Sequence, residues 1–253
     1  MKNNYKSLSR VYDRFTRNVD YRLYSWLIHR ELKQNNIKGI VLDAGCGTGT
    51  LTLLLDRLGY DMIGADISED MLAVANDKSV KSKKPITFLC QDLTKLDLYG
   101  TVNAVICSLD TINHIESEKD LKKVFSRFSL FTEPNGLLIF DINTSYKHSK
   151  VLADNTFVFD DGDNVLVWQN EYDSKKKRVL ISTDLFSSDG QGLYERSSDA
   201  FYEYDYTVKV IERLLSKTGY SLLKHFDFEN ERDICEATER IVFVAKKVEG
   251  IEK

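Results

Sequence analysis

The chain has 253 residues, of which 42% are hydrophobic and 29% are charged. This composition excludes a fibrous or disordered chain and suffices for one soluble domain with an additional segment. The formal net charge of -4 provides no overall basic field, which disfavours a nucleic-acid substrate.

The N-terminal residues, MKNNYKSLSRVYDRF, are polar and mixed in charge, and no apolar run reaches the length of a membrane span. We therefore expect a cytoplasmic monomer or homodimer with no membrane partner. The four cysteines are scattered, at Cys46, Cys90, Cys107 and Cys235, and no histidine stands at metal-ligand spacing from them. Free thiols and no metal site are predicted.

Apolar runs alternate with helical periodicities along the first part of the chain, after an N-terminal helical region that ends near Asn36. Helices are predicted to begin near residues 50, 69 and 118. The predicted strands cover residues 39–43, 60–65, 86–90, 102–107 and 136–141. This succession is typical of an α/β, doubly wound, Rossmann-like fold with a mostly parallel sheet.

The pattern changes from about residue 151, where period-two alternation broken at DDGD and SSDGQG predicts antiparallel hairpins. A helix closed by Gly219 and two final strands follow, at the usual place for an antiparallel edge. We expect an α/β core of residues 1–146 and 207–253, with residues 1–36 as N-terminal lid helices. Residues 147–206 would form a β insertion, rich in aromatic residues, that serves as a substrate lid or a dimer contact.

The stretch VLDAGCGTGT, residues 41–50, joins a predicted strand to a predicted helix. Its glycines, at positions 45, 47 and 49, allow a tight turn that a ligand can approach closely. The stretch lacks the lysine of a phosphate-binding P-loop, and its third glycine comes one residue too early for a dinucleotide motif. Asp43 directly precedes the turn, where an acid suits a cationic ligand.

VLDAGCGTG resembles the D-x-G-x-G-x-G motif of class I S-adenosylmethionine-dependent methyltransferases, and the resemblance extends over about residues 36–143 and the C-terminal strands. It implies S-adenosylmethionine as cofactor, S-adenosylhomocysteine as product, and no metal. Asp66 follows the second strand, where it would accept the ribose hydroxyls, and Asp92 follows the third, near the adenine amino group. Singly, each acid is typical of a helix cap or turn, but in this order at strand ends they form a specific signal.

The resemblance predicts a set of cofactor-binding residues, in which Ile67 and Met71 flank the adenine while Ser68 caps the next helix. The set comprises Tyr12, Asp43, Ala44, Gly45, Cys46, Gly47, Gly49, Asp66, Ile67, Met71, Gln91, Asp92, Leu93 and Leu109. The N-terminal pattern of Tyr5, Tyr12 and Asp13 resembles a bacterial small-molecule subgroup whose lead-in helices cover the cofactor. Tyr12, Tyr21 and Trp26 are candidates to close the pocket, although simple helix packing explains the last two equally well.

The segment CSLDTINHI follows the fourth strand, on the expected acceptor side. It lacks the proline of N-P-P-Y motifs, and no cysteine stands in a proline-cysteine pair as cytosine C5 enzymes require. In sugar N-methyltransferases that this chain resembles, a histidine and a tyrosine lie beside the acceptor amine. The resemblance therefore makes His114 and Tyr12 catalytic candidates. Asp110, Asn113 and Asp141 are candidate substrate residues; structural roles also fit His114, at a helix start, and Asp141, at a strand end.

Two functions remain open. The first is methyl transfer to nitrogen or oxygen of a small molecule by in-line displacement. The alternative is a methyltransferase fold that acts on, or docks to, a protein or ribosomal partner through the aromatic insertion.

Overall fold

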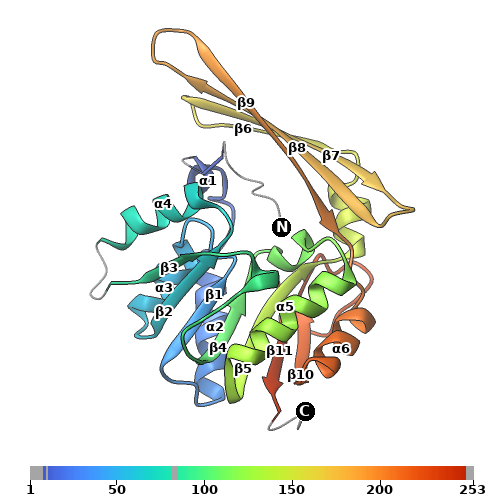
Figure 1. The fold of residues 1–253 in the computed structure, drawn as a ribbon. Coiled ribbons are helices and arrows are strands. Elements are labelled where there is room, and N and C mark those ends of the chain that lie inside the picture. The colour runs from blue at the N-terminus through green and yellow to red at the C-terminus, as the bar shows by residue number, and fades with distance from the viewer. Residues whose placement is uncertain (1–7, 10, 81–84, 249–253) are drawn as a thin grey trace.

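The computed structural model describes residues 8–9, 11–80 and 85–248, so Tyr5 lies outside the described residues. A seven-stranded sheet with the order β10-β11-β5-β4-β1-β2-β3 forms its centre (Figure 1). Its strands are β1 Ile40–Ala44, β2 Asp61–Asp66, β3 Thr87–Cys90, β4 Val102–Cys107, β5 Thr132–Asn143, β10 Tyr220–Asp227 and β11 Arg240–Lys247. All neighbours pair in parallel except β11, which runs antiparallel to both β5 and β10. The predicted mostly parallel α/β fold is confirmed.

Helices cover both faces of this sheet. They are α1 Tyr12–Phe15, α2 Tyr21–Gln34, α3 Thr50–Arg57, α4 Glu69–Ser79, α5 Glu118–Phe131 and α6 Val208–Lys217, with short helices η1 Leu93–Lys95, η2 Thr111–His114 and η3 Lys147–Leu152. Leu27, Ile28 and Leu55 of α2 and α3 pack on one face. Phe125 and Phe128 of α5 pack with α6 residues on the other face. In the described chain no helix has the length and apolarity needed to cross a membrane.

The predicted strands and helix starts agree with the structure, but the antiparallel strand is not at the edge. Strand β11 lies between β5 and β10, and β10 is the edge strand. Phe243, Val244 and Ala245 of β11 are fully buried, whereas most positions of β10 are exposed or half-buried. A strand covered on both faces requires neighbours on both sides, because its backbone groups cannot reach water.

A second, antiparallel sheet contains β6 Thr156–Asp160, β7 Asn164–Asp173, β8 Arg178–Ser188 and β9 Tyr194–Tyr204 in that order. Leu166 and Leu185 of this sheet pack with Leu8 and Phe15 of the N-terminal region. Figure 1 shows the sheet, in yellow to orange, above the carboxyl ends of the parallel strands. The segment predicted as an insertion therefore lies over the sheet edge where ligands bind in doubly wound folds.

Candidate active site

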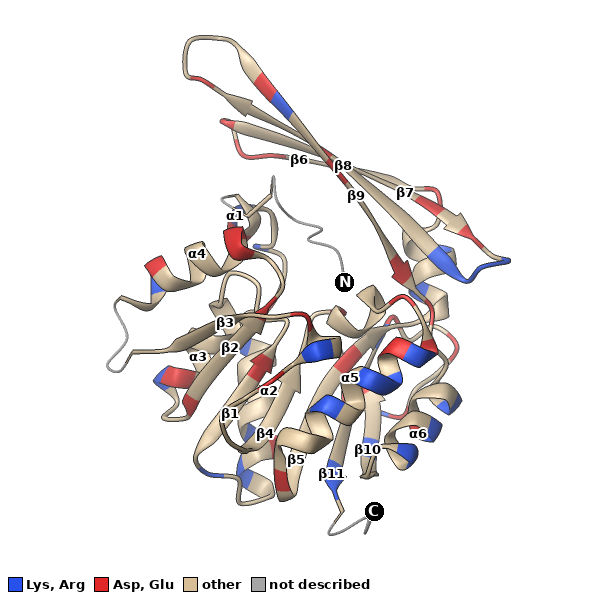
Figure 2. Ribbon diagram, in the orientation of Figure 1, with Lys and Arg blue, Asp and Glu red and all other residues tan. Residues whose placement is uncertain are grey.

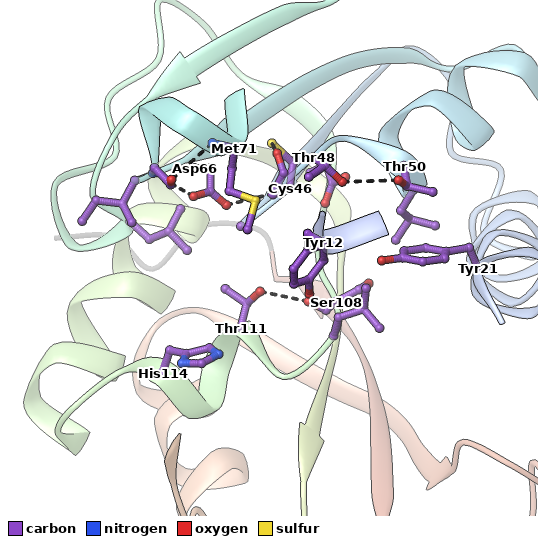
Figure 3. A pocket seen from close by; sticks show the side chains of 18 residues that line it. Tyr12, Tyr21, Cys46, Thr48, Thr50, Asp66, Met71, Ser108, Thr111 and His114 are labelled. Atoms are coloured by element: carbon purple, nitrogen blue, oxygen red, sulfur yellow. Dashed lines mark hydrogen bonds between the residues drawn. The ribbon is translucent and has the colours of Figure 1, made fainter. Parts of the chain in front are cut away.

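A pocket lies at the carboxyl ends of β1, β2 and β4, and we name it the cofactor pocket. It is lined by Tyr12, Tyr21, Asp43, Gly45, Cys46, Gly47, Thr48, Thr50, Leu51, Asp66, Ile67, Ser68, Met71, Leu93, Ser108, Leu109, Thr111 and His114. Figure 3 shows the Tyr12 ring between the glycine-rich turn and the segment that carries Thr111 and His114. Segments separated by about a hundred residues of sequence thus share one cavity.

The glycine-rich turn is fixed by backbone hydrogen bonds to β2. The amides of Gly45 and Cys46 donate to the Ala65 carbonyl at 2.7 and 3.1 Å. Gly45 has φ of +80°, and a Cβ there would lie 2.4 Å from the Thr111 side chain. Gly47 has φ of +51°, and no atom lies within 4 Å of where its Cβ would be, so a ligand can approach this backbone directly.

Asp43 ends β1 beneath the turn, with 2% of its surface exposed. Its carboxylate accepts a hydrogen bond of 2.5 Å from the Thr52 hydroxyl of α3. Burial raises the pKa of Asp43 to about 7, against the lowering effect of the Thr52 hydrogen bond, and the charge of Asp66 adds to the rise. A buried carboxyl with a raised pKa is stabilised in its charged form by a bound cation.

Asp66 ends β2 and is held by two backbone amides. Its Oδ2 accepts a hydrogen bond from the Gly47 amide at 2.8 Å, and its Oδ1 accepts one from the Ser68 amide at 2.9 Å. Burial raises the pKa of Asp66, and these backbone hydrogen bonds oppose the rise. Ser68 caps α4 by accepting from the Met71 amide at 3.3 Å, as the sequence predicted. The carboxylate is thereby fixed at the rim of the pocket.

Two predicted cofactor residues around the glycine-rich turn, Ala44 and Gly49, do not line the pocket. Ala44 is fully buried within β1. A Cβ at Gly49, whose φ is +71°, would lie 3.0 Å from Ala75 of α4 and 3.3 Å from Phe88. Gly49 therefore allows α3 and α4 to pack closely, and its contact with a ligand stays a prediction.

Gln91 and Asp92 also lie outside the lining residues and organise their own loop. The Gln91 side chain donates to the Asp97 carbonyl at 3.0 Å and accepts from the Asp97 amide at 2.8 Å. Asp92 caps η1 by accepting from the amide and hydroxyl of Thr94, both at 2.8 Å. Their contact with a ligand likewise stays a prediction.

The N-terminal region is tied to the pocket through Asp13. Its carboxylate accepts hydrogen bonds from Thr48 at 2.6 Å and Thr50 at 3.2 Å, and it pairs with Lys78 of α4 at 2.6 Å. Thr48 of the glycine-rich turn and Thr50, the first residue of α3, both line the cofactor pocket. These contacts hold the neighbouring Tyr12 over the cavity.

Of the three aromatic side chains considered for closing the pocket, Tyr12 and Tyr21 line it. Trp26 does not: it is 52% exposed and stacks under the Arg30 guanidinium, whose Cζ is 4.7 Å from the ring centre. Burial raises the pKa of Tyr12 well above its usual value, and the charges of Tyr21 and Asp110 act in the same direction. Tyr12 therefore remains a neutral hydroxyl at physiological pH.

The segment after β4 takes an unusual backbone path that Asp141 stabilises. Leu109 and Asp110 are consecutive non-glycine residues with φ of +58° and +54°. Asp141, at 2% exposure, accepts from both their amides, at 2.8 and 3.1 Å. Arg240 of β11 pairs with Asp141 and with Asp110, the latter at 2.7 Å. Asp141 and Asp110 are thus held by Arg240, and neither lines the cofactor pocket.

Asn113 is fully buried and joins the two sheets. It accepts from the Asn143 amide at 2.9 Å and donates to the carbonyls of Asn143 and Tyr204 at 3.1 and 3.0 Å. With all these contacts inside the protein, Asn113 fixes the position of η2. Contact between a substrate and Asn113, Asp110 or Asp141 stays a prediction.

His114 ends η2 and faces both sheets. Its Nε2 lies 3.8 Å from an Asp110 carboxylate oxygen, and its ring centre lies 5.3 Å from that of Phe201 in β9. Among the described residues, ligand atoms of Asp110, His114 and Glu203 lie within 4.8 Å of one another, close enough to share a metal ion. Asp110, however, already pairs with Arg240. The expected absence of a metal stays a prediction.

Glu203 of β9 is buried beside His114. His148 of η3 lies 3.1 Å from it, and Asn143 donates to it at 2.9 Å. Burial pushes the pKa of Glu203 upward, but the hydrogen bond from His148 and the charge of His114 outweigh burial and lower the pKa below its usual value. A carboxylate therefore faces His114 from the second sheet.

A second cavity, here named the acceptor cavity, opens between η2, the start of α5 and the second sheet. It is lined by Thr94, His114, Ile115, Glu116, Asp120, Arg178, Ala200, Phe201, Tyr202 and Tyr204. His114 belongs to the lining of both cavities. The side chains from β8 and β9 could not be assigned to this site from the sequence, since nothing in their alternation shows which face meets the core.

Similarity to known proteins identifies the family. A family described as methyltransferase domain matches residues 41–136. "Putative methyltransferase GWCH70_2453" of Geobacillus sp. (strain WCH70) is 30% identical over 246 residues, which cover 96% of this chain and 99% of that protein. The crystal structure of an S-adenosylmethionine-dependent methyltransferase from Clostridium acetobutylicum ATCC 824 is 31% identical, with a TM-score of 0.86 and coverage of 96% and 99%. The chain belongs to the S-adenosylmethionine-dependent methyltransferases.

The fold extends to more distant structures. The sugar N-methyltransferase KedS8 from Streptoalloteichus sp ATCC 53650 has 18% identity and a TM-score of 0.78, with coverage of 98% of this methyltransferase and 97% of KedS8. The coverage includes the second sheet, so the two-sheet arrangement is shared at low sequence identity.

The pocket of this methyltransferase fits the chemistry of its cofactor. S-adenosylmethionine carries an ammonium and a sulfonium, and this positive charge suits the buried carboxyl of Asp43. The open space at Gly47 lets backbone contact the ligand, and Ile67 and Met71 provide apolar surface for an adenine ring.

Proposed function

We propose that this methyltransferase transfers a methyl group to nitrogen or oxygen of a small molecule bound in the acceptor cavity. One observation carries the proposal: His114 lines both the cofactor pocket and the acceptor cavity. A nucleophile in the acceptor cavity would meet the cofactor's methyl group at this junction. The proposed in-line displacement depends mainly on such alignment and on the removal of one proton.

The cofactor would be oriented by residues of the first two strand ends. Asp66 would accept hydrogen bonds from the two ribose hydroxyls, and Ile67 with Met71 would enclose the adenine. Asp43 balances the positive charge near the glycine-rich turn. When bound, the cofactor supplies an electrophilic methyl group on a positively charged sulfur, and Asp13 keeps Tyr12 closed over it.

His114 is proposed to accept the proton that the acceptor loses as its N–C or O–C bond forms. The carboxylates of Asp110 and Glu203 nearby stabilise the protonated imidazole. Tyr12, which burial keeps neutral, orients the nucleophile by hydrogen bonding rather than acting as a base. The second sheet, predicted as a lid, excludes water from this junction.

Calorimetric titration with S-adenosylmethionine and S-adenosylhomocysteine, followed by a methyl-transfer screen of sugar amines, phenols and small carboxylates, tests the proposal. His114→Ala should lower turnover by about 100-fold or more, a typical loss for a general base, with a smaller effect on cofactor affinity. His29→Ala is the matched control, because His29 of α2 lies 3.0 Å from the Tyr60 hydroxyl and lines neither cavity.

Cofactor binding with turnover that depends on His114 would support a small-molecule enzyme. Binding without turnover of any small acceptor would favour the alternative of a protein or ribosomal target. Two exposed apolar residues, Val158 of β6 at 62% and Leu193 of the β8–β9 turn at 72%, would then be the first surface to test.

A further inference from the structure

Arg178 of β8 is the basic residue of the acceptor cavity. Its guanidinium carbon lies 3.9 Å from the centre of the Tyr202 ring, which fixes the plane of the group. The Arg178 Nε is buried and makes no hydrogen bond within the described ranges 8–9, 11–80 and 85–248. The guanidinium also contacts the Tyr204 hydroxyl, which leaves several of its donors for a ligand.

Arg178 differs from Arg196, an arginine of the same sheet, in its partners. Arg196 of β9 donates twice to Asp184, at 3.0 and 2.8 Å, and is therefore satisfied by the protein itself. No carboxylate of the described part of the chain lies within 4.0 Å of the Arg178 nitrogens. Figure 2 shows basic residues gathered at the β7–β8 turn, directly before Arg178. A stacked guanidinium without a carboxylate partner suits bidentate binding of a carboxylate or phosphate.

The other side of the cavity is acidic. Glu116 lies two residues after the end of η2 and lines the cavity. Asp120 also lines it but is engaged by Ser117 at 2.8 Å and Lys123 at 2.7 Å. Asp110 and Glu203 also lie close to His114, although neither lines the cavity. This side favours binding of an amine in its ammonium form next to His114, which takes one proton from it so that the neutral nitrogen can attack the methyl carbon.

We propose that the acceptor is an amine that also carries an anionic group, with the anion bound by Arg178 and the amine placed beside His114. The proposal rests on the proposed function and narrows its substrate class. Arg178 contacts a part of the acceptor that does not react, so it acts through acceptor binding and specificity and takes no part in the proton transfer.

Matched amine pairs with and without an anion provide the test: glucosamine 6-phosphate against glucosamine, and glycine against glycinamide. The first pair reports on phosphate and the second on carboxylate. The wild-type protein should prefer the anionic member of at least one pair. Arg178→Met should raise KM for that member by about 10- to 100-fold while kcat stays within about twofold. The reason is that the lost interaction stabilises the bound substrate and the transition state equally. Arg178→Lys should restore part of the loss, and Arg196→Met is the matched control.

Direct titration of the S-adenosylhomocysteine-loaded protein with the same four compounds separates this inference from the proposed function. Anion-dependent binding that Arg178→Met removes would support the inference even where no turnover occurs. Cofactor binding combined with no preference for an anion, or with equal binding by Arg178→Met and wild type, would overturn it. Absence of cofactor binding would instead refute the cofactor pocket of the proposed function.

Discussion

Replacement of Asp43 by asparagine is expected to remove a pH dependence of the free energy of unfolding. Burial raises the pKa of this carboxyl from its ordinary 3.8 to about 7 in the folded protein. Between these values the folded state binds a proton that the unfolded state has lost, so the stability contributed by Asp43 falls as pH rises from about 4 to about 7. The raised pKa means that the deprotonated carboxyl destabilises the apoprotein above pH 7.

The size of the expected change in the free energy of unfolding follows from the pKa shift of Asp43. A rise of the pKa from 3.8 to about 7, at about 1.36 kcal/mol for each pKa unit, corresponds to about 4 kcal/mol. The 2% exposure of Asp43 leaves little solvent screening. Asparagine keeps the shape and an acceptor oxygen for the Thr52 hydroxyl, so Asp43→Asn changes mainly the charge.

Urea unfolding of the cofactor-free protein at several values between about pH 4 and pH 8 measures this difference. The wild type should lose up to about 4 kcal/mol more than Asp43→Asn over this range. Asp77→Asn, which removes an exposed carboxylate of α4, is the control and should behave as the wild type. Equal pH slopes for the wild type and Asp43→Asn would refute the argument that burial of this carboxyl controls its ionisation.

Three further predictions concern the cofactor pocket. Gly45→Ala should lower the free energy of unfolding, measured in urea, by about 2 kcal/mol or more. Both the left-handed φ and the contact of the new Cβ with Thr111 destabilise the folded state. Asp66→Ala should weaken S-adenosylmethionine binding by about 100-fold or more in calorimetry, through loss of two charge-assisted hydrogen bonds. Asp13→Asn should weaken cofactor binding by a smaller factor, about 3- to 10-fold, and its effect should shrink at high salt because it removes an ion pair.

Matched variants separate these causes. Gly59→Ala has a comparable φ of +99° but open space at the Cβ position, so it isolates backbone strain from contact with Thr111. An equal decrease in the free energy of unfolding for Gly45→Ala and Gly59→Ala would contradict the predicted steric effect of Thr111. Unchanged affinity in Asp66→Ala would contradict the ribose assignment, and a salt-independent effect of Asp13→Asn would contradict an electrostatic tether.

The sequence predicted the strand order along the chain and much of the cofactor pocket, because both depend on local signals. A glycine-rich turn after an apolar run must bend at that place, and acids directly after parallel strands must meet at one sheet edge. Asp43 and Asp66 are therefore found where expected. Asp92 stands after its predicted strand as well, but it caps η1 and does not line the pocket. Local position at a strand end cannot show which way a side chain turns.

The acceptor side depended on contacts between distant segments. Asp141 was a candidate substrate residue, yet it binds the amides of Leu109 and Asp110 and pairs with Arg240, about a hundred residues later. The strained backbone at Leu109 carries no sequence signal, since neither it nor its neighbour is glycine. Arg178 is one more charged residue in an alternating strand until β8 and β9 are placed over η2.

The sequence by itself determined the fold class, the family and the place of the cofactor turn, since hydrophobic periodicity and turn residues act between near neighbours. Only the tertiary structure decided how η2, β9 and β11 meet around His114 and which charges remain available to an acceptor. The ion pair of Arg240 with Asp110 neutralises charge between segments far apart in the chain. Among the described residues Arg178 has no such carboxylate partner. Only three-dimensional packing distinguishes the paired arginine from the unpaired one.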